Sequence, residues 1–274
     1  MKKYITLFFD VEGWYEAPYR RKFNLDENMT TILDILEKHH VKAVFNTCGI
    51  IAENFPSIVE RMQNEGHEIA SHGYAHENLY QLSLEEMNKV LKKTETILEG
   101  ITGEKPHGIR APWLIYDERF YNVLIKRGYK WSSNTQVFFY HERIYDMQKF
   151  VTKTYSALNK LVFRVGRLFC KKMPFKIGNL YEIPLLSEMD GVLIGPVDTS
   201  QETPMSLLNY AYKRLITQSS KYKKFFNLNF HDWFIGSANR PLLLDKILKY
   251  FSSKEEITYI LAKDIHRVLP ETEL

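Results

Sequence analysis

Short apolar runs alternate with amphipathic stretches along the 274-residue chain, and this alternation restricts the fold more than any other feature. Runs typical of buried strands occupy residues 4–9, 41–47, 67–71, 108–110, 130–132, 180–184, 224–230 and 257–261. Stretches with the apolar spacing of helices occupy residues 28–40, 50–65, 83–100, 117–127, 203–219 and 241–252. Because sustained strand–helix alternation is typical of parallel sheets, the sequence predicts an α/β fold whose sheet is open or closed into a barrel.

Several helix ends carry their own signals. Ser83 is a good N-cap, and Glu86 three residues later completes a capping box, so we expect a helix from here to about Gly100. Pro56 is expected to break the helix at 50–65, and Gly66 to end it.

Composition is that of a globular protein, with 45% apolar and 26% charged residues, and the length fits one large domain or two small ones. The net charge of +4 is too small to argue for a nucleic-acid partner. Cys48 and Cys170 form neither a metal pair nor a disulfide framework, which favours a reduced compartment. The apolar run at 4–9 is too short for a signal peptide or a membrane span, so we expect a cytoplasmic protein.

One stretch, residues 138–179, breaks the rhythm and is interpreted as an irregular basic insertion. Within it, residues 160–172 interleave apolar and basic side chains at roughly helical spacing. The pattern fits a solvated helix that covers one face of the domain. It also fits peripheral contact with the inner membrane surface or with an anionic substrate, and both interpretations stay open.

Two histidines in the segment Ser71-His72-Gly73-Tyr74-Ala75-His76 are the strongest chemical signal. In a helix or a tight turn, residues four apart have Cβ atoms roughly 5–6 Å from each other, a separation that lets two imidazoles hold one metal ion. Asp10 and Glu12 follow a predicted strand two residues apart, so their side chains leave on the same face. One carboxylate could complete a metal site and the other act as general base, or both could simply cap the strand end.

Two further residues at predicted strand ends suit hydrolysis. His231 could protonate a leaving group, because imidazole titrates near neutral pH, or it could be a structural residue. Arg110 is a natural partner for a carboxylate, either to orient a base or in a plain buried ion pair. Pro112 and Trp113 form a groove wall in one interpretation, while in the other Trp113 belongs to the core. Since ligand sites in parallel α/β folds lie at the carboxyl ends of strands, we expect these residues to converge at one rim.

The order of these elements resembles the polysaccharide deacetylases of carbohydrate esterase family four, the NodB-homology domain. The resemblance is carried by the strand ending at Asp10, the stretch 66–76, Arg110-Ala111-Pro112-Trp113, Glu182-Ile183-Pro184 and Leu228-Asn229-Phe230-His231. It covers nearly the whole chain and implies a single domain over residues 1–274, a distorted (β/α)7 barrel similar to a TIM barrel. It also implies hydrolysis of an N-acetyl group with one divalent metal ion, zinc first and cobalt as the alternative.

The resemblance assigns a role to each matching residue. Asp10 is the expected base, Arg110 the residue that tunes it, and His231 the acid. Glu12, His72 and His76 are the expected metal ligands. Substrate contacts are expected from Tyr74, whose backbone N–H would hold the oxyanion, and from Pro112 and Trp113.

The chain departs from the usual family pattern at two places. The first motif is Asp10-Val11-Glu12 instead of adjacent aspartates, as in a branch of the family that spaces its two acids one residue apart. Ser132 stands where many members carry an aspartate, so the carboxylate that orients the arginine or the acid is either missing or supplied from elsewhere, with Asp198 and Asp232 as candidates.

The sequence therefore predicts a metal-dependent N-deacetylase acting on an amino sugar that is free, polymeric or lipid-linked. Hydrolysis of a non-sugar linear or cyclic amide is the alternative within enzymes. An inactive carbohydrate-binding protein on the same barrel is the alternative outside them. A neighbouring subunit over the groove, in an oligomer, is left open.

Overall fold

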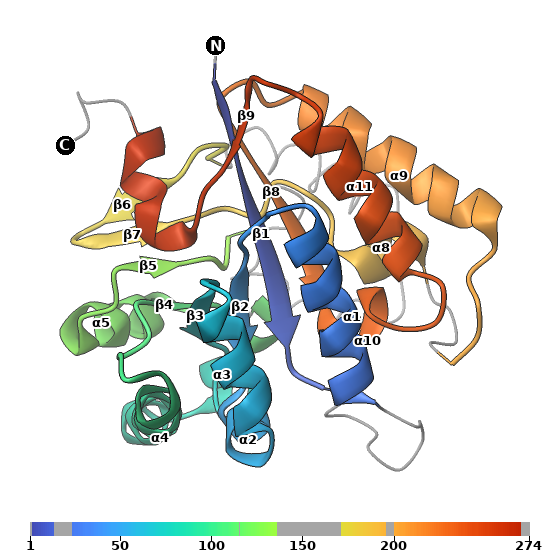
Figure 1. Cartoon of the computed structure of the whole chain (residues 1–274). Coiled ribbons are helices and arrows are strands. Elements are labelled where there is room, and N and C mark those ends of the chain that lie inside the picture. Colours follow the sequence, from blue (N-terminus) through green and yellow to red (C-terminus); the bar gives the residue numbers. More distant parts are fainter. Residues whose placement is uncertain (1, 14–23, 115, 136–170, 196–199, 270–274) are drawn as a thin grey trace, which may run out of the picture.

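The computed structural model describes residues 2–13, 24–114, 116–135, 171–195 and 200–269, and in these ranges a single curled sheet forms the centre of the molecule (Figure 1). Its nine strands are β1 (Lys3–Val11), β2 (Val44–Thr47), β3 (Glu68–Ser71), β4 (Gly108–Ile109), β5 (Trp131–Ser132), β6 (Phe175–Ile177), β7 (Leu180–Glu182), β8 (Phe225–His231) and β9 (Ile257–Tyr259). The order is β6-β7-β5-β4-β3-β2-β1-β8, and β9 pairs with the first residues of β1. All pairings are parallel except β6–β7, so the predicted parallel α/β architecture is confirmed.

Helices connect the strands and cover the outer face of the sheet (Figure 1). They are α1 (Leu25–Lys38), α2 (Gly49–Asn54), α3 (Pro56–Asn64), α4 (Leu84–Thr102), α5 (Glu118–Arg127), α8 (Asp190–Ile194), α9 (Met205–Ser220), α10 (Asp232–Ile235) and α11 (Pro241–Ser252). The capping box predicted at Ser83 and Glu86 is present at the start of α4, and Pro56 separates α2 from α3 as expected. No helix in the described ranges is both long and apolar enough to cross a bilayer.

Strand β1 shows how one short segment serves both the core and the site. Alternate side chains of a strand point to opposite faces. On the outer face, the Phe9 ring packs against Phe45 and Phe230 of the two neighbouring strands, with centroids 5.2 Å and 5.5 Å away. On the inner face, Phe8 lies under the Arg110 guanidinium at 4.6 Å, and Asp10 follows two residues later. The apolar outer layer thus fixes the strand that carries Asp10.

Side chains join the end of β7 to β8, because no backbone ladder connects these two strands among the described residues. The Asn227 amide accepts a hydrogen bond from the Leu186 N–H and donates one to the Pro184 carbonyl, both at 2.8 Å. Asn229 donates to the Ser187 hydroxyl at 3.0 Å. These bonds close the curled sheet into a distorted barrel.

The structure corrects the sequence analysis in the region after β5. Residues 136–170, which include most of the basic insertion and of the 160–172 stretch, lie outside the described residues. The insertion was expected to reach residue 179, but β6 (Phe175–Ile177) already forms an antiparallel hairpin with β7. Two short helices, α8 and α10, were also not predicted, because four or five residues are too few to show helical periodicity.

Candidate active site

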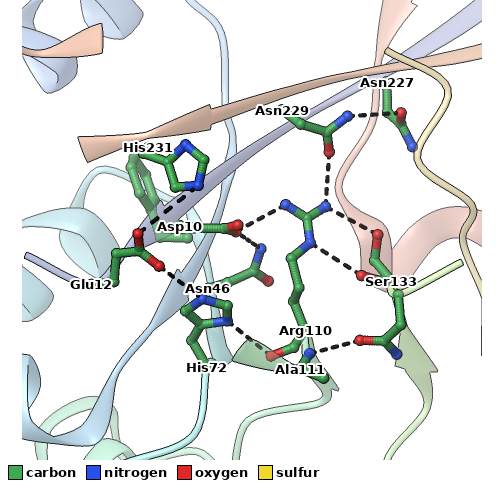
Figure 2. A network of polar contacts seen from close by, with 12 residues as sticks. Asp10, Glu12, Asn46, His72, Arg110, Ala111, Ser133, Asn227, Asn229 and His231 are labelled. Atoms are coloured by element: carbon green, nitrogen blue, oxygen red, sulfur yellow. Dashed lines mark hydrogen bonds and ion pairs between the residues drawn. The ribbon is translucent and has the colours of Figure 1, made fainter. Parts of the chain in front are cut away.

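Side chains from five neighbouring strands and the residues directly after them meet at one rim of the barrel (Figure 2). The register explains this convergence, since Asp10 is the pairing partner of both Asn46 on β2 and His231 on β8. His72 follows β3 and Arg110 follows β4. The structure therefore brings together the residues that the sequence analysis expected at one site.

Glu12, His72 and His76 form a buried cluster whose three candidate ligand atoms all lie within 4.8 Å of one another. Glu12 Oε2 lies 3.2 Å from His72 Nε2 and 2.8 Å from His76 Nε2. The histidines belong to a turned loop and not to a helix, because Gly73 has φ +70° and His76 has φ +59°. The turn nevertheless brings the two ring centroids to 5.0 Å.

The hydrogen bonds of this cluster fit a divalent cation. His72 Nδ1 lies 2.9 Å from the Arg110 carbonyl oxygen, which can only accept, so Nδ1 carries the hydrogen. In the neutral ring the Nε2 lone pair then faces the Glu12 carboxylate, and a shared cation relieves that opposition. Burial raises the pKa of Glu12, but His231, His72 and His76 outweigh it and hold that pKa well below its usual value. The carboxylate is thus ionised and suited to bind a metal.

Asp10 has a different environment from Glu12. Its Oδ1 accepts hydrogen bonds from Arg110 Nη1 at 2.9 Å and from Asn46 Nδ2 at 2.7 Å (Figure 2). Both donors bind the same oxygen, which leaves Oδ2 outside these two bonds. Asn46, the pairing partner of Asp10 on the neighbouring strand β2, was not singled out from the sequence.

Arg110 is completely buried and is held by the loop that follows β5. It donates to the Ser133 carbonyl at 3.1 Å and hydroxyl at 3.0 Å, and to Asn229 Oδ1 at 2.8 Å. Glu182 supports that loop by accepting from the N–H groups of Asn134 and Thr135, each at 2.7 Å. These contacts orient the arginine without an aspartate at Ser132.

His231 is oriented by a residue that the sequence analysis missed. Its Nδ1 lies 2.6 Å from Asp190 Oδ1, and its backbone N–H donates to Asp190 Oδ2 at 2.8 Å. Burial lowers the pKa of His231, but Asp190, Glu12 and Asp10 outweigh it and raise this pKa to about 10. The imidazole is therefore protonated near neutral pH, as an acid must be.

Asp190 corrects the two candidates named for this role. Asp198 lies outside the described residues, and the Asp232 carboxylate accepts the Glu12 N–H at 3.1 Å instead. Burial raises the pKa of Asp232 to about 7. Asp190 begins the short helix α8, and nothing in the sequence distinguishes it from other acids at helix starts.

The residues expected to contact substrate, Tyr74, Pro112 and Trp113, differ in where the structure places them. Trp113 is 46% exposed, so it is not core, and its ring meets His76 edge-on with centroids 5.2 Å apart. Pro112 is buried beside Gly73. The Tyr74 N–H, expected to hold an oxyanion, instead donates to Glu77 at 3.0 Å, and the Tyr74 hydroxyl donates to Glu53 at 2.5 Å. In this structure Tyr74 therefore presents neither group to the site.

Comparisons with known proteins show which proteins this chain is similar to. Residues 1–132 match the family model for polysaccharide deacetylase. A peptidoglycan-N-acetylglucosamine deacetylase from Bacillus cereus is 40% identical over 102 residues, which are 37% of this chain and 34% of the relative. Residues 1–132 are therefore similar to polysaccharide deacetylases. The match of the chain spans about a third of the length of this curated relative.

Solved structures extend the likeness to nearly the whole chain. A crystal structure from Mycobacterium smegmatis, provisionally named a polysaccharide deacetylase, superposes with a TM-score of 0.74 at 17% identity and covers 97% of this chain and 90% of that one. Puue allantoinase gives a TM-score of 0.64 at 15% identity, over 97% of this chain and 89% of that one. At these identities the likeness concerns the fold, and it confirms the predicted distorted barrel.

Proposed function

We propose that this protein is a metal-dependent deacetylase that hydrolyses the N-acetyl group of an amino sugar, in a polymeric or lipid-linked substrate. The observation that carries the proposal is the pairing of one three-ligand cluster with two separately supported acid–base groups. Glu12, His72 and His76 would hold the ion, with zinc first and cobalt as the alternative. The Bacillus cereus relative acts on peptidoglycan N-acetylglucosamine by name, which makes that sugar the first substrate to test.

The residues of the site divide the proton transfers of amide hydrolysis. A divalent ion in the cluster supplies Lewis-acid polarisation of the acetyl carbonyl and a more acidic water. Arg110 and Asn46 hold Asp10 Oδ1, so Oδ2 takes the proton of the attacking water. His231, held at Nδ1 by Asp190, gives the proton on Nε2 to the leaving nitrogen as the C–N bond breaks. The products are acetate and a free amine.

The position of His231 beside the cluster supports this division. His231 Nε2 lies 3.9 Å from Glu12 Oε1, so the acid stands beside the proposed ligand on the side opposite the histidines. Trp233, which the sequence analysis did not single out, donates from its indole N–H to the same Glu12 oxygen at 2.8 Å. Glu12 is thereby fixed between the acid and the metal-binding loop.

The test combines metal content with product release. Purified wild-type protein and His72→Ala are compared for bound divalent metal. Acetate release is measured with N-acetylglucosamine oligomers, and opening of the hydantoin ring to allantoate is measured with allantoin. Near-stoichiometric metal in the wild type, its loss in the variant, and acetate from the sugar support the proposal. Turnover of allantoin alone would assign the site to a non-sugar amide. Metal-free protein that only binds sugar would indicate an inactive carbohydrate-binding protein.

The cytoplasmic location and the membrane contact stay predictions.

A further inference from the structure

The loop between the two histidines adopts a backbone that needs external support. His76 has φ +59°, a left-handed conformation that residues with a Cβ rarely adopt, and Gly73 has φ +70° three residues earlier. Such a conformation persists where neighbouring groups fix it. In this loop it turns the His76 ring toward Glu12, to 2.8 Å between Nε2 and Oε2.

The side chain of Glu77 binds the N–H groups on the inner side of this turn. Its Oε2 accepts from the Tyr74 N–H at 3.0 Å and its Oε1 from the Ala75 N–H at 2.9 Å. One carboxylate thus satisfies two successive amides directly before His76. Because Glu77 follows His76 in the chain, these two bonds close the turn around the histidine.

The carbonyl groups of the same turn are bound from the other side. The Gly73 and Tyr74 carbonyls accept from the N–H groups of Gly49 and Ile50 at the start of α2, each at 2.9 Å. A Cβ at Gly73 would lie 3.1 Å from Glu77 Oε2, so the glycine also leaves room for the carboxylate. The turn is therefore held between α2 and Glu77, and Glu77 is the contact made by a side chain.

We infer that Glu77 is a positioning residue for the metal site. By holding the turn, Glu77 orients His76 so that His76 can bind the same ion as Glu12 and His72. The inference rests on the proposed function, since it concerns the same cluster. Without the carboxylate, the Tyr74 and Ala75 amides lose their acceptor, and His76 relaxes toward negative φ, which turns its ring away from Glu12. Metal affinity falls in consequence, while the folded barrel remains.

Glu53 provides a matched control. It is also a glutamate that contacts this loop, but it accepts from the Tyr74 hydroxyl and not from the backbone of the turn. We would measure the Co²⁺ dissociation constant by chelator competition, the visible spectrum of the Co²⁺ protein and the melting temperature of the metal-free protein. The variants are Glu77→Ala, Glu77→Gln and Glu53→Gln.

We expect Glu77→Ala to bind Co²⁺ at least about tenfold more weakly and with an altered spectrum, the size of effect seen when groups that orient a metal ligand are removed. Glu77→Gln keeps one acceptor oxygen and should lie between Glu77→Ala and the wild type, while Glu53→Gln should match the wild type. If Glu77→Ala does not fold, Glu77→Gln decides the outcome. Wild-type affinity and spectrum in the Glu77 variants would overturn this inference alone, whereas a wild type that binds no Co²⁺ would overturn the proposed function with it.

Discussion

Asp10 and Glu12 lie two residues apart, yet their carboxylates have opposite kinds of neighbours. Asp10 is bound by a guanidinium and an amide, which hold one of its oxygens inside the barrel. Glu12 faces two imidazole nitrogens with one oxygen and an indole N–H with the other. Because these neighbours differ, substitutions at the two acids should have separable effects.

Asp10→Asn should retain the metal and lose turnover. The amide keeps an oxygen that Arg110 can bind, but it cannot take a proton from water, and loss of a general base typically costs about 10²–10⁴-fold in rate. Metal content and kcat of the variant, measured together, check this. Loss of the metal would mean that Asp10 is a ligand and that the two acids exchange roles.

Asp190→Asn should move the alkaline limb of the pH–rate profile to lower pH. Asp190 is the foremost group that raises the pKa of His231, to about 10, so removing its charge lowers that pKa. A catalytic imidazolium then deprotonates at lower pH, and activity is lost earlier as the pH rises. Asp245→Asn, a substitution in a surface ion pair, is the control. An unchanged alkaline limb would exclude His231 as the acid whose ionisation the profile reports.

At the scale of elements, short strands depend on close packing between neighbours. Strands β4 and β5 pair over only two residues each, Gly108 with Trp131 and Ile109 with Ser132. A Cβ at Gly108 would overlap the buried Trp131 indole. The glycine therefore lets the large ring fill the space beside β4, where Arg110 follows.

Gly108→Ala should destabilise the protein by about 1–3 kcal/mol, the usual range for overpacking a filled core. Gly100→Ala is a matched control for which the expected change in stability has the opposite sign. Gly100 lies within α4, and its added Cβ would meet nothing within 4 Å. Alanine is the better helix former by about 0.5–1 kcal/mol, so this variant should be more stable than the wild type. Urea denaturation of both variants checks the pair, and equal stabilities would refute the packing argument.

The helices, the strands and the candidate catalytic and metal-binding residues could be predicted from the sequence. The contacts that hold those residues in place could not. Apolar periodicity located β1, α4 and β8, and the capping box located the start of α4, because these signals are local. Strand ends then implied the meeting of Asp10, His72 and His231. The sequence analysis did not identify Asn46, Asp190 and Glu77, because each acts through a hydrogen bond for which the sequence carries no local signal. Asn46 and Asp190 depend on register and on a short helix, and Glu77 depends on a turn with an unusual φ.

At the scale of the whole molecule, one buried carboxylate joins three distant segments. Glu68 on β3 accepts from the Trp131 indole of β5 at 2.7 Å and from the Lys263 N–H at 2.9 Å, in the 3-10 segment Ala262–Val268. Burial raises the pKa of Glu68 to about 7. Its protonation state is therefore a property of the assembled fold, since in the unfolded chain it ionises near its ordinary value.

The contribution of Glu68 to the stability of the protein should fall as the pH rises from about 4.5 to about 7. In this window the folded state keeps the Glu68 proton and the unfolded state releases it, so the contribution of this group declines by up to about 1.4 kcal/mol per pH unit and is constant above the window. Denaturation at several pH values should give a stability that falls more steeply with pH, or rises less steeply, in the wild type than in Glu68→Gln. Equal pH dependence in the two proteins would mean that folding does not raise the pKa of Glu68.

The contact between Glu12 and His72 has a consequence for how the ion enters. Burial lowers the pKa of His72, but Asp10 and Glu12 outweigh it and raise this pKa, so a proton competes with an ion for the nitrogen that faces Glu12. Metal uptake should therefore release about one proton to the solution. Titration calorimetry in buffers of different ionisation enthalpy should give heats that vary linearly with that enthalpy, and buffer-independent heats would show that the nitrogen is already free of its proton. If the proposed ion binds in this way, its uptake should become more favourable as the surroundings become more alkaline.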